Sequence, residues 1–382
     1  MTSTQPRPIA PLDLAAERAQ CGPALFEALE RVLASGAYVL GPEVQAFEKE
    51  FADYQGAAHG VGVASGTDAL VVAMRALGLP LGSKVLTTPF TFFASAGAIA
   101  WCDAKPTFVD VDPDTALMRL DQVASALDSQ TVGVVPVHLY GALVDIPALR
   151  EITDQRGLWV LEDGAQAHGA SRSSGGAEPW RCGAHGHAAA FSFYPTKNLG
   201  AAGEGGMVLT QSEAVASDLT QLRDHGSVAK YMHGRVGTNS RLQAMQAAVL
   251  RVKLPHLDGW NGMRREHAAR YQAAFGGSES VTPLRVEPGT THAFHQFAVR
   301  IRGEDGARER VQQALAAQGI AAAVHYPRCV HEQEAAKDWG YGPGDFPGAE
   351  QLAREVLCLP IHPFLEPGDV DRVAEAVLTA AR

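Results

Sequence analysis

The sequence predicts an α/β fold in which a largely parallel sheet is covered by helices on both faces. Between about residues 60 and 210, short β-rich runs alternate with helix-like segments, which is typical of repeated βαβ units. The chain has 382 residues and therefore exceeds the usual size of a single core. We expect one large α/β domain with a smaller companion.

Seven runs in this region are predicted strands. In chain order they cover residues 60–64, 84–88, 106–111, 132–137, 158–162, 188–193 and 206–210. Between them, apolar residues at helical spacing predict helices over residues 67–77 and 120–127. In such a sheet a ligand belongs beyond the carboxyl ends of the strands.

The last third of the chain predicts a smaller α+β lobe. A helical run over residues 243–254 ends at Pro255, and the polar stretch after it should continue as a long helix. We place the boundary there, so that residues 1–255 form the large domain and residues 256–382 the small one. The small domain has predicted strands over 296–301 and 356–359 and predicted helices over 305–318 and 367–381. Residues 173–178 (SSGGAE) indicate a flexible loop.

Composition excludes several classes of protein. The 42 acidic and 32 basic residues give a net charge of −10 without a block of like charge, so nucleic acid is not an expected partner. The 5 cysteines are scattered and never form Cys-x-x-Cys, which argues against a disulfide framework or a structural zinc site. The N-terminus lacks the layout of a signal peptide, and no apolar run approaches the roughly 18 residues of a membrane span. We expect a soluble cytoplasmic protein.

Lys197 stands between a predicted strand and a glycine-rich turn that leads into the next strand. A lysine amine attacks a carbonyl only when it is unprotonated, so a catalytic lysine needs a partly desolvated setting or a nearby positive charge. The apolar strands on both sides supply the first condition. Taken alone, a Lys-Asn-Leu-Gly stretch is more often an ordinary surface turn.

Gly66 and Thr67 follow a predicted strand and open a predicted helix. Free backbone N–H groups and a hydroxyl at a helix N-terminus would hold an anion, most plausibly a phosphate. Ser-Gly-Thr before a helix is also an ordinary capping sequence, and the Walker spacing is absent.

Asp163 lies at the carboxyl end of a predicted strand, where a pyridinium nitrogen would be a natural partner. Enzymes that use pyridoxal phosphate keep the ring nitrogen protonated with a carboxylate, although an acidic helix cap explains a single Asp equally well. With Phe92 in a Thr-Phe-Phe segment, the ordered set of Gly-Thr, Asp and Lys is what a phosphate-bearing pyridine aldehyde requires.

From about residue 30 to the C-terminus, the chain resembles the DegT/DnrJ/EryC1/StrS family of pyridoxal-phosphate-dependent sugar aminotransferases. Among the matching segments are VASGTDAL, TTPFTFFASAGAI, VLEDGAQAHGA, FSFYPTKNLGAAGEGG, VGTNSRLQAMQAAVL and VHYPRCVH. The resemblance implies fold type I, with a mostly parallel seven-stranded sheet flanked by helices.

The resemblance also implies a role for each cofactor-binding residue. Lys197 would form the Schiff base with pyridoxal 5'-phosphate, Asp163 would pair with the pyridine nitrogen, Gln166 would lie near the O3′ side of the ring, and Phe92 would stack on the ring face.

The same resemblance assigns the phosphate to Gly66 and Thr67 together with the hydroxyl of Ser192. Asn239 of the GTNSR motif would come from the neighbouring subunit, which implies a homodimer with two shared sites.

His325 and Tyr326 match a family segment that reaches toward the nucleotide-sugar substrate across the dimer interface. Tyr194, Tyr231 and Arg241 are candidate substrate or phosphate contacts. Tyr194 is equally compatible with core packing, and Tyr231 with an ordinary loop position.

Three histidines attract attention as a possible metal cluster, namely His168, His185 and His187. His185 and His187 alternate on an extended segment and no acid completes a ligand set, so no metal is expected.

The expected reaction is a two-stage transamination. L-Glutamate would leave its nitrogen on the cofactor as pyridoxamine phosphate, and the ketone of a nucleotide-linked keto-deoxysugar would then receive it, with Lys197 as general acid and base. VGTNSR and VHYP favour a 3-keto sugar. Some family members carry histidine in place of the lysine and act as dehydratases, which Lys197 argues against.

The sequence leaves two alternatives open. The acceptor could be a keto-inositol or another cyclic ketone precursor in an antibiotic pathway, or the chain could be a non-catalytic regulator that senses the cofactor. Residues 171–183 match no family segment, and His295 stands where a more hydrophobic entry into a strand is expected. These departures bear on the substrate rather than on the chemistry.

Overall fold

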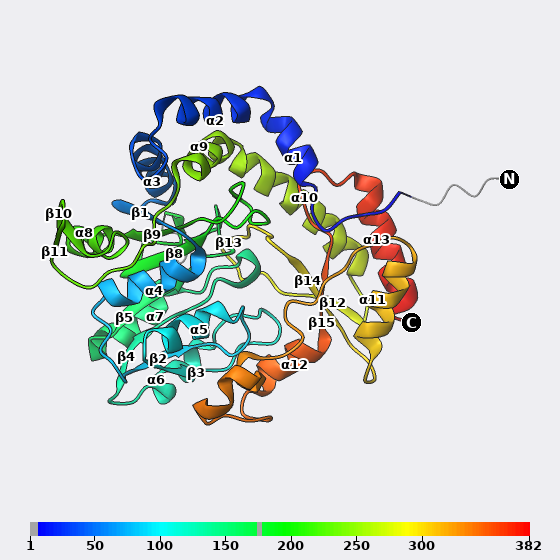
Figure 1. Cartoon of the computed structure of the whole chain (residues 1–382). Coiled ribbons are helices and arrows are strands. Elements are labelled where there is room, and N and C mark those ends of the chain that lie inside the picture. Colours follow the sequence, from blue (N-terminus) through cyan, green and yellow to red (C-terminus); the bar gives the residue numbers. More distant parts are fainter. Residues whose placement is uncertain (1–6, 174–177) are drawn as a thin grey trace.

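The computed structural model describes residues 7–173 and 178–382, and a seven-stranded sheet forms its centre (Figure 1). The strands are β1 (His59–Val63), β2 (Lys84–Thr87), β3 (Lys105–Phe108), β4 (Thr131–Val134), β5 (Trp159–Asp163), β8 (Ala188–Ser192) and β9 (Gly206–Thr210). Their order is β1-β9-β8-β5-β4-β2-β3. Each strand lies within a few residues of its predicted position.

All neighbouring strands from β3 to β8 pair in parallel, while β9 runs antiparallel to both β8 and β1. The prediction of a mostly parallel seven-stranded sheet is therefore confirmed. Parallel neighbours require crossover connections, and the alternation of strands and helices in the sequence supplies them.

Helices cover both faces of this sheet. They include α4 (Gly66–Ala76), α5 (Ala94–Trp101) and α8 (Glu213–Leu222) on one face, and α6 (Leu120–Ala126) and α7 (Ile146–Thr153) on the other. Val160 and Leu161 are neighbours in β5, yet they belong to the apolar clusters on opposite faces. Side chains alternate along a strand, so a strand buried on both faces is apolar throughout.

Three N-terminal helices were not predicted, namely α1 (Leu14–Cys21), α2 (Pro23–Ser35) and α3 (Pro42–Gln55). Both α2 and α3 begin with proline directly after a glycine with positive φ, at Gly22 and Gly41. Proline is favoured in the first turn because its missing N–H has no intrahelical acceptor there. In Figure 1 these helices run along one side of the molecule, from the large sheet towards the second lobe.

The second lobe is built on an antiparallel sheet of β12 (Val281–Pro283), β14 (Phe297–Ile301) and β15 (Val356–Leu359). Its helices are α10 (Leu257–Phe275), α11 (Ala307–Ala317), α12 (Pro347–Glu355) and α13 (Pro367–Ala380). Helix α9 (Ala244–Lys253) leads into α10 through a short 3-10 turn over Leu254–His256. The boundary at residue 255 falls within this turn, and the division into domains stays a prediction.

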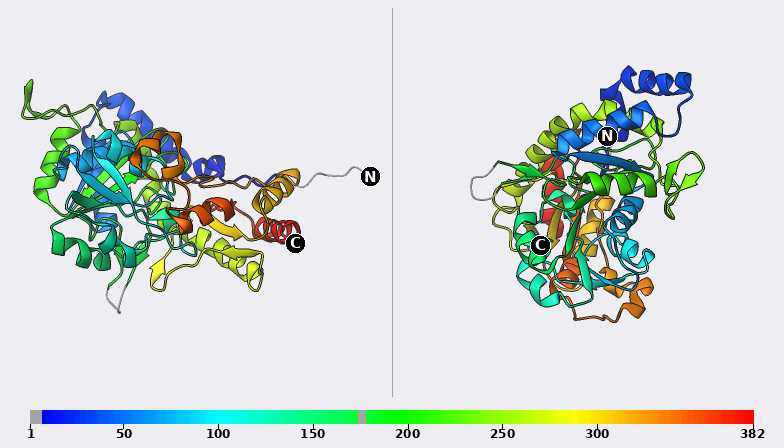
Figure 2. Two further views of the ribbon diagram at one scale, coloured as in Figure 1. Left: turned by 90° about the horizontal axis from the view of Figure 1, so that it is seen from below. Right: turned by 90° about the vertical axis from the view of Figure 1, so that its left-hand side faces the viewer.

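Two small features complete the fold. A hairpin of β10 (Ser227–Ala229) and β11 (Met232–His233) projects from the body of the large domain (Figure 2). The strands β6 (Ser171–Arg172), β7 (Trp180–Arg181) and β13 (Thr290–Thr291) form a separate short sheet. The loop predicted over residues 173–178 lies largely outside the described residues. None of the helices over the described ranges combines the length and the apolar character needed to cross a bilayer.

Candidate active site

The predicted cofactor residues gather at one edge of the central sheet. Gly66 and Thr67 open α4 directly after β1, Asp163 ends β5, Ser192 ends β8, and Lys197 lies in the turn region between β8 and β9. β1, β5 and β8 point the same way, so their carboxyl ends meet at this edge. This is the edge at which open α/β sheets bind ligands.

Ser192 and Gly66 are in close contact where β8 meets the N-terminus of α4. A Cβ added at Gly66 would lie 2.5 Å from the Cβ of Ser192, so a side chain has no room there. The Ser192 Oγ accepts the backbone N–H of Tyr194 at 3.3 Å, which leaves its O–H free to donate. Ser65 caps the helix by accepting the N–H of Asp68 at 3.1 Å, and the first helical N–H groups have no intrahelical acceptor. These groups suit a phosphate.

Asp163 is 6% exposed, and both of its carboxylate oxygens accept hydrogen bonds. Ser95 Oγ donates to Oδ2 at 2.7 Å, and the N–H of Ala165 donates to Oδ1 at 3.1 Å. No helix begins at Asp163, so the helix-cap alternative does not apply. The donors hold the carboxylate where a protonated ring nitrogen could pair with it. Ser95 was not predicted, although it lies in the same segment as Phe92.

Lys197 is half-buried, and this burial lowers the pKa of its amine to about 8, while the charge of Asp163 acts in the opposite direction. Its backbone N–H donates to the carbonyl of Tyr194 at 2.9 Å, which closes the turn. The structure therefore supplies the desolvated setting that the flanking strands predicted.

Gln166 connects the strand end to the second lobe. Its Oε1 accepts the backbone N–H of Tyr140 at 2.6 Å, and its Nε2 lies 3.5 Å from the hydroxyl of Tyr326. The Tyr140 hydroxyl donates to the carbonyl of His325. Tyr140 was not predicted; it is buried and has a positive φ, which the sequence around it does not signal.

Phe92 is 58% exposed, and its ring centroid lies 6.1 Å from that of Tyr326. An exposed aromatic ring can stack on a planar ring. Burial, together with the charge of Lys197, lowers the pKa of His325. The structure thus brings Phe92, His325 and Tyr326 to the same edge as Lys197.

The remaining predicted residues lie elsewhere or face solvent. Tyr194 is exposed, so the core-packing alternative for it is wrong. Tyr231 is 84% exposed and lies between the strands of the projecting hairpin. Asn239 is also exposed, and its Oδ1 accepts from Arg241 Nε at 3.0 Å. Arg241 in turn donates to Asp224 at 2.9 Å. Within one chain these residues do not join the Lys197 group, and their roles stay predictions.

The three histidines considered for a metal have different surroundings. His168 packs between phenylalanine rings, among them Phe191 at 5.4 Å, whereas His185 packs on Trp180 at 5.1 Å. His187 Nδ1 accepts the N–H of Val160 at 2.9 Å.

A different buried group, His138, Glu162 and Cys182, has ligand atoms within 4.8 Å of one another. The Nδ1 of His138 accepts the N–H of Val144 at 3.1 Å, so its Nε2 carries the hydrogen and donates to Glu162 at 2.8 Å. Glu162 also accepts the N–H of Gly186 at 2.8 Å. The partners of this group are internal, which is how a structural network is satisfied.

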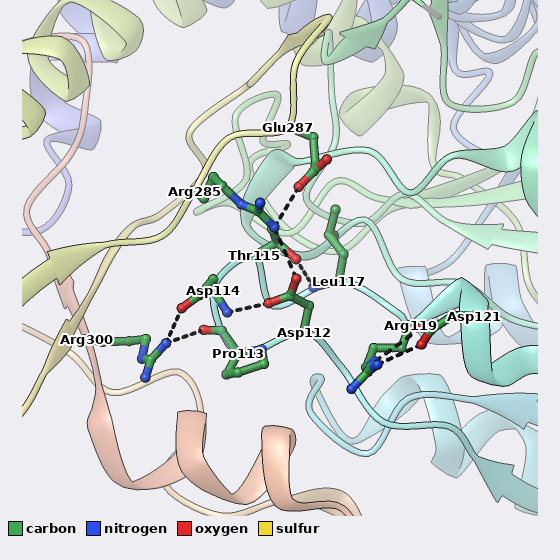
Figure 3. Close-up of polar contacts among 10 residues, drawn as sticks. All are labelled: Asp112, Pro113, Asp114, Thr115, Leu117, Arg119, Asp121, Arg285, Glu287 and Arg300. Carbon is green, nitrogen blue, oxygen red and sulfur yellow. Dashed lines mark hydrogen bonds and ion pairs between the residues drawn. The ribbon is translucent and has the colours of Figure 1, made fainter.

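A surface cavity of about 590 Å³ lies away from Lys197, against residues 112–121. Figure 3 shows its charged groups in pairs: Arg285 Nη2 is 3.1 Å from a carboxylate oxygen of Asp112 and also 3.1 Å from one of Glu287. These charges satisfy one another, and none of the described residues that line the cavity belongs to the predicted cofactor site.

Comparison with known proteins agrees with this geometry. The family model described as the DegT/DnrJ/EryC1/StrS aminotransferase family matches residues 20–378. The chain belongs to this family. The predicted family and fold class are therefore confirmed, as is the prediction that the chain is an aminotransferase.

Two relatives that resemble the chain over nearly its whole length have different names. A dTDP-3-amino-3,4,6-trideoxy-alpha-D-glucose transaminase from Streptomyces venezuelae is 43% identical over 99% of this chain and 97% of its own length. The erythromycin biosynthesis sensory transduction protein EryC1 from Saccharopolyspora erythraea is 44% identical over 97% of this chain and 99% of its own.

Solved structures of the family superpose closely on the chain. S. venezuelae DesV, in complex with a ketimine intermediate, gives a TM-score of 0.93 at 42% identity and covers 99% of both chains. NtdA from Bacillus subtilis, with bound cofactor PMP, gives 0.90 at 25% identity and covers all of this chain and 87% of its own. At the level of the family, the prediction of a pyridoxal phosphate cofactor with a pyridoxamine phosphate form is confirmed.

Proposed function

We propose that this chain transfers the amino group of L-glutamate to a nucleotide-linked keto-deoxysugar, with a 3-keto sugar favoured, in amino-sugar biosynthesis. The observation that carries the proposal is Lys197, half-buried at the carboxyl edge of the sheet and within reach of the charge of Asp163. Its pKa of about 8 leaves part of the amine unprotonated near neutral pH, which carbonyl chemistry requires.

The residues of the site fit pyridoxal phosphate, which supplies an electron-withdrawing ring when bound. The N-terminus of α4 and the Ser192 hydroxyl suit its phosphate, and no side chain at Gly66 blocks the approach. Asp163 would pair with the protonated ring nitrogen, and Phe92 would stack on the ring. Lys197 would serve first as the general base and then as the general acid that moves the substrate's proton.

Support for the acceptor comes from both lobes. His325 and Tyr326 lie at the lysine site, where they could orient a ketone. The S. venezuelae relative is named as a transaminase of dTDP-3-amino-3,4,6-trideoxy-alpha-D-glucose, which is a 3-amino sugar linked to dTDP. Tyr194 lies next to the same site, and its exposed ring could contact the sugar or the nucleotide.

A homodimer with shared sites belongs to this proposal. The hairpin and the residues after it expose apolar side chains to solvent, with Tyr231 at 84% and Val236 at 94% exposed, and a second copy of the chain would cover them. Asn239 and Arg241 follow this segment, so a partner could receive them at its own site. A mixture of Lys197→Ala and Asn239→Ala chains, unfolded and refolded together, should regain activity that neither homodimer has. A mixture that stays inactive would contradict sharing.

We also propose that the protein works in the cytoplasm. All 5 cysteines are buried and free, as is usual in a reducing compartment.

The central experiment is spectroscopic. Purified protein with pyridoxal phosphate should show the absorbance of a lysine-bound cofactor and lose it when L-glutamate is added. Lys197→Ala should show neither the band nor turnover, whereas Lys105→Ala, which removes an exposed lysine on β3, should behave as wild type. Transamination at the native rate by Lys197→Ala would overturn the proposal.

A panel of acceptors separates this function from its alternatives. The enzyme is incubated with glutamate and one acceptor at a time, and the amino product is detected by mass. The acceptors are a keto-inositol and keto sugars linked to dTDP, UDP or GDP, which are made in situ. Amination of a 3-keto nucleotide sugar supports the proposal, and amination of the keto-inositol alone favours the second acceptor class. The name of EryC1 raises the further alternative of a sensory protein, which would bind the cofactor without conversion by glutamate.

A further inference from the structure

Ser240 of the GTNSR segment is buried, although Asn239 before it is exposed. Its Oγ accepts the backbone N–H of Ala64 at 3.1 Å and lies 2.9 Å from Oδ2 of Asp68. An N–H group only donates, so the hydrogen of the Ser240 hydroxyl is left for Asp68. This one hydroxyl therefore joins both sides of the turn that leads from β1 into α4.

The turn carries the groups proposed to bind the phosphate. Gly66 and Thr67 lie between the two residues that Ser240 contacts, and their N–H groups have no acceptor among the residues that the structure describes. Ser65 Oγ accepts the N–H of Asp68 at 3.1 Å, but this bond lies within the turn and does not fix it to the rest of the protein. The hydroxyl of Ser240 does so from outside, on both sides of the two free N–H groups.

Ser240 is itself held in place through its backbone. Its N–H donates to the carbonyl of Arg223 at 2.9 Å. Arg223 is buried, and its Nη1 donates to the carbonyl of Gly62 in β1 at 2.8 Å and to Glu48 of α3. These bonds hold the segment after the hairpin against β1 and α3. A shift of the turn would therefore lengthen at least one of the two hydrogen bonds of the Ser240 hydroxyl.

We propose that Ser240 is a positioning residue of the phosphate site, whose hydroxyl holds the N–H groups of Gly66 and Thr67 in the arrangement that a phosphate requires. The proposal rests on the function proposed above, which assigns the phosphate to this turn. It goes further because, in the proposed homodimer, Asn239 serves the site of the partner subunit while Ser240 serves the site of its own chain. Two adjacent residues would then join the two sites.

The test separates the phosphate from the rest of the cofactor. Full-length protein freed of its cofactor is titrated by calorimetry with pyridoxal phosphate, with pyridoxal, which lacks the phosphate, and with inorganic phosphate. In Ser240→Ala the affinities for pyridoxal phosphate and for inorganic phosphate should fall about tenfold, the effect of one lost hydrogen bond. The affinity for pyridoxal should stay that of wild type, because pyridoxal has no group for the turn to bind.

Thr210→Val is the matched control. Thr210 is buried, and its Oγ1 accepts the N–H of Ser212 at 3.1 Å and donates to the carbonyl of His187 at 2.7 Å. It pairs with His59 at the opposite edge of the sheet. Its replacement should lower the free energy of unfolding in urea, as in Ser240→Ala, yet leave all three affinities unchanged. If the ratio of the pyridoxal phosphate and pyridoxal affinities is the same in Ser240→Ala as in wild type, Ser240 has only a structural role and the proposal is overturned.

A second pair of variants leaves Ser240 in place and so does not depend on how Ser240→Ala folds. Asp68→Asn and Asp68→Ala both remove a negative charge from the first turn of α4, but only asparagine can still accept from Ser240. Asp68→Ala should therefore bind inorganic phosphate about 5-fold more weakly than Asp68→Asn, and equal affinities overturn the proposal. Failure of the proposed function has a different signature, because wild type would then bind pyridoxal phosphate no more tightly than pyridoxal.

Discussion

Gly66→Ala tests the contact between α4 and β8 as the phosphate site. The new Cβ would lie 2.5 Å from Cβ of Ser192, 3.0 Å from its Oγ and 3.1 Å from its Cα. Two of these three atoms cannot rotate away, because Cβ and Cα of Ser192 belong to a buried strand end. The overlap must therefore be relieved by moving the helix N-terminus or the strand end.

Relief of such an overlap in a packed region costs about 1–3 kcal/mol. In the cofactor-free protein the helix can shift outward, but a bound phosphate requires the N–H groups of α4 and the Ser192 hydroxyl in their original places. Most of the cost should then appear in binding, and because each 1.4 kcal/mol is tenfold, cofactor affinity should fall by roughly 5- to 150-fold.

The assay is a titration of cofactor-free protein with pyridoxal phosphate, followed by absorbance, together with urea unfolding of the same preparation. Gly259→Ala is the matched control, because an added Cβ there meets nothing within 4 Å. Gly259 lies within α10, so its replacement should stabilise the protein by about 1 kcal/mol and leave affinity unchanged. If Gly66→Ala binds the cofactor within twofold of wild type, the α4–β8 contact does not hold the phosphate.

Three further predictions concern the rest of the chain. The amine of Lys197 has a folded pKa of about 8, below that of an unfolded lysine, so the unfolded state binds more protons from about pH 8 to pH 10.4. In urea unfolding of cofactor-free protein, the free energy of unfolding of wild type should therefore rise with pH across that window relative to that of Lys197→Met. A fall would show that the pKa of Lys197 is not lowered in the folded state. Asp110 accepts the N–H groups of Gly348 at 2.8 Å and Ala349 at 2.9 Å at the start of α12, so Asp110→Ala should cost about 1–2 kcal/mol in urea unfolding, and no loss would refute the cap. Because His138 donates through Nε2, dialysis against a chelator should leave the thermal midpoint and activity unchanged, and a drop that zinc restores would reveal a metal at Glu162.

The sequence predicted the central sheet well for a physical reason. Strands buried on both faces are continuously apolar, so residues 158–162 and 188–193 stand out from the helices between them. The N-terminal helices were missed because their apolar residues face α9 and the flank of the sheet, while other apolar side chains, such as Phe26 and Leu33 of α2, face solvent. Because apolar residues lie on both the buried and the exposed sides of these helices, their spacing in the sequence does not show a helical period.

Some residues of the candidate site could be predicted from the sequence and others could not. Asp163, Ser192 and Lys197 follow strand ends, and a parallel sheet brings strand ends together, so their proximity follows from chain order. Tyr140 reaches the site through a turn with positive φ. It has no motif of its own, and only tertiary structure reveals it.

The residues proposed to act on the cofactor and those proposed to contact the acceptor lie on different parts of the chain. The groups proposed to act on the cofactor, Asp163, Ser192 and Lys197, are attached to one sheet. The groups proposed to meet the acceptor include His325 and Tyr326 of the second lobe. Tyr140 joins these parts, because its hydroxyl donates to the carbonyl of His325 while its N–H holds Gln166. A change in the acceptor-facing segments can therefore alter which ketone is received while the Lys197–Asp163 arrangement stays intact.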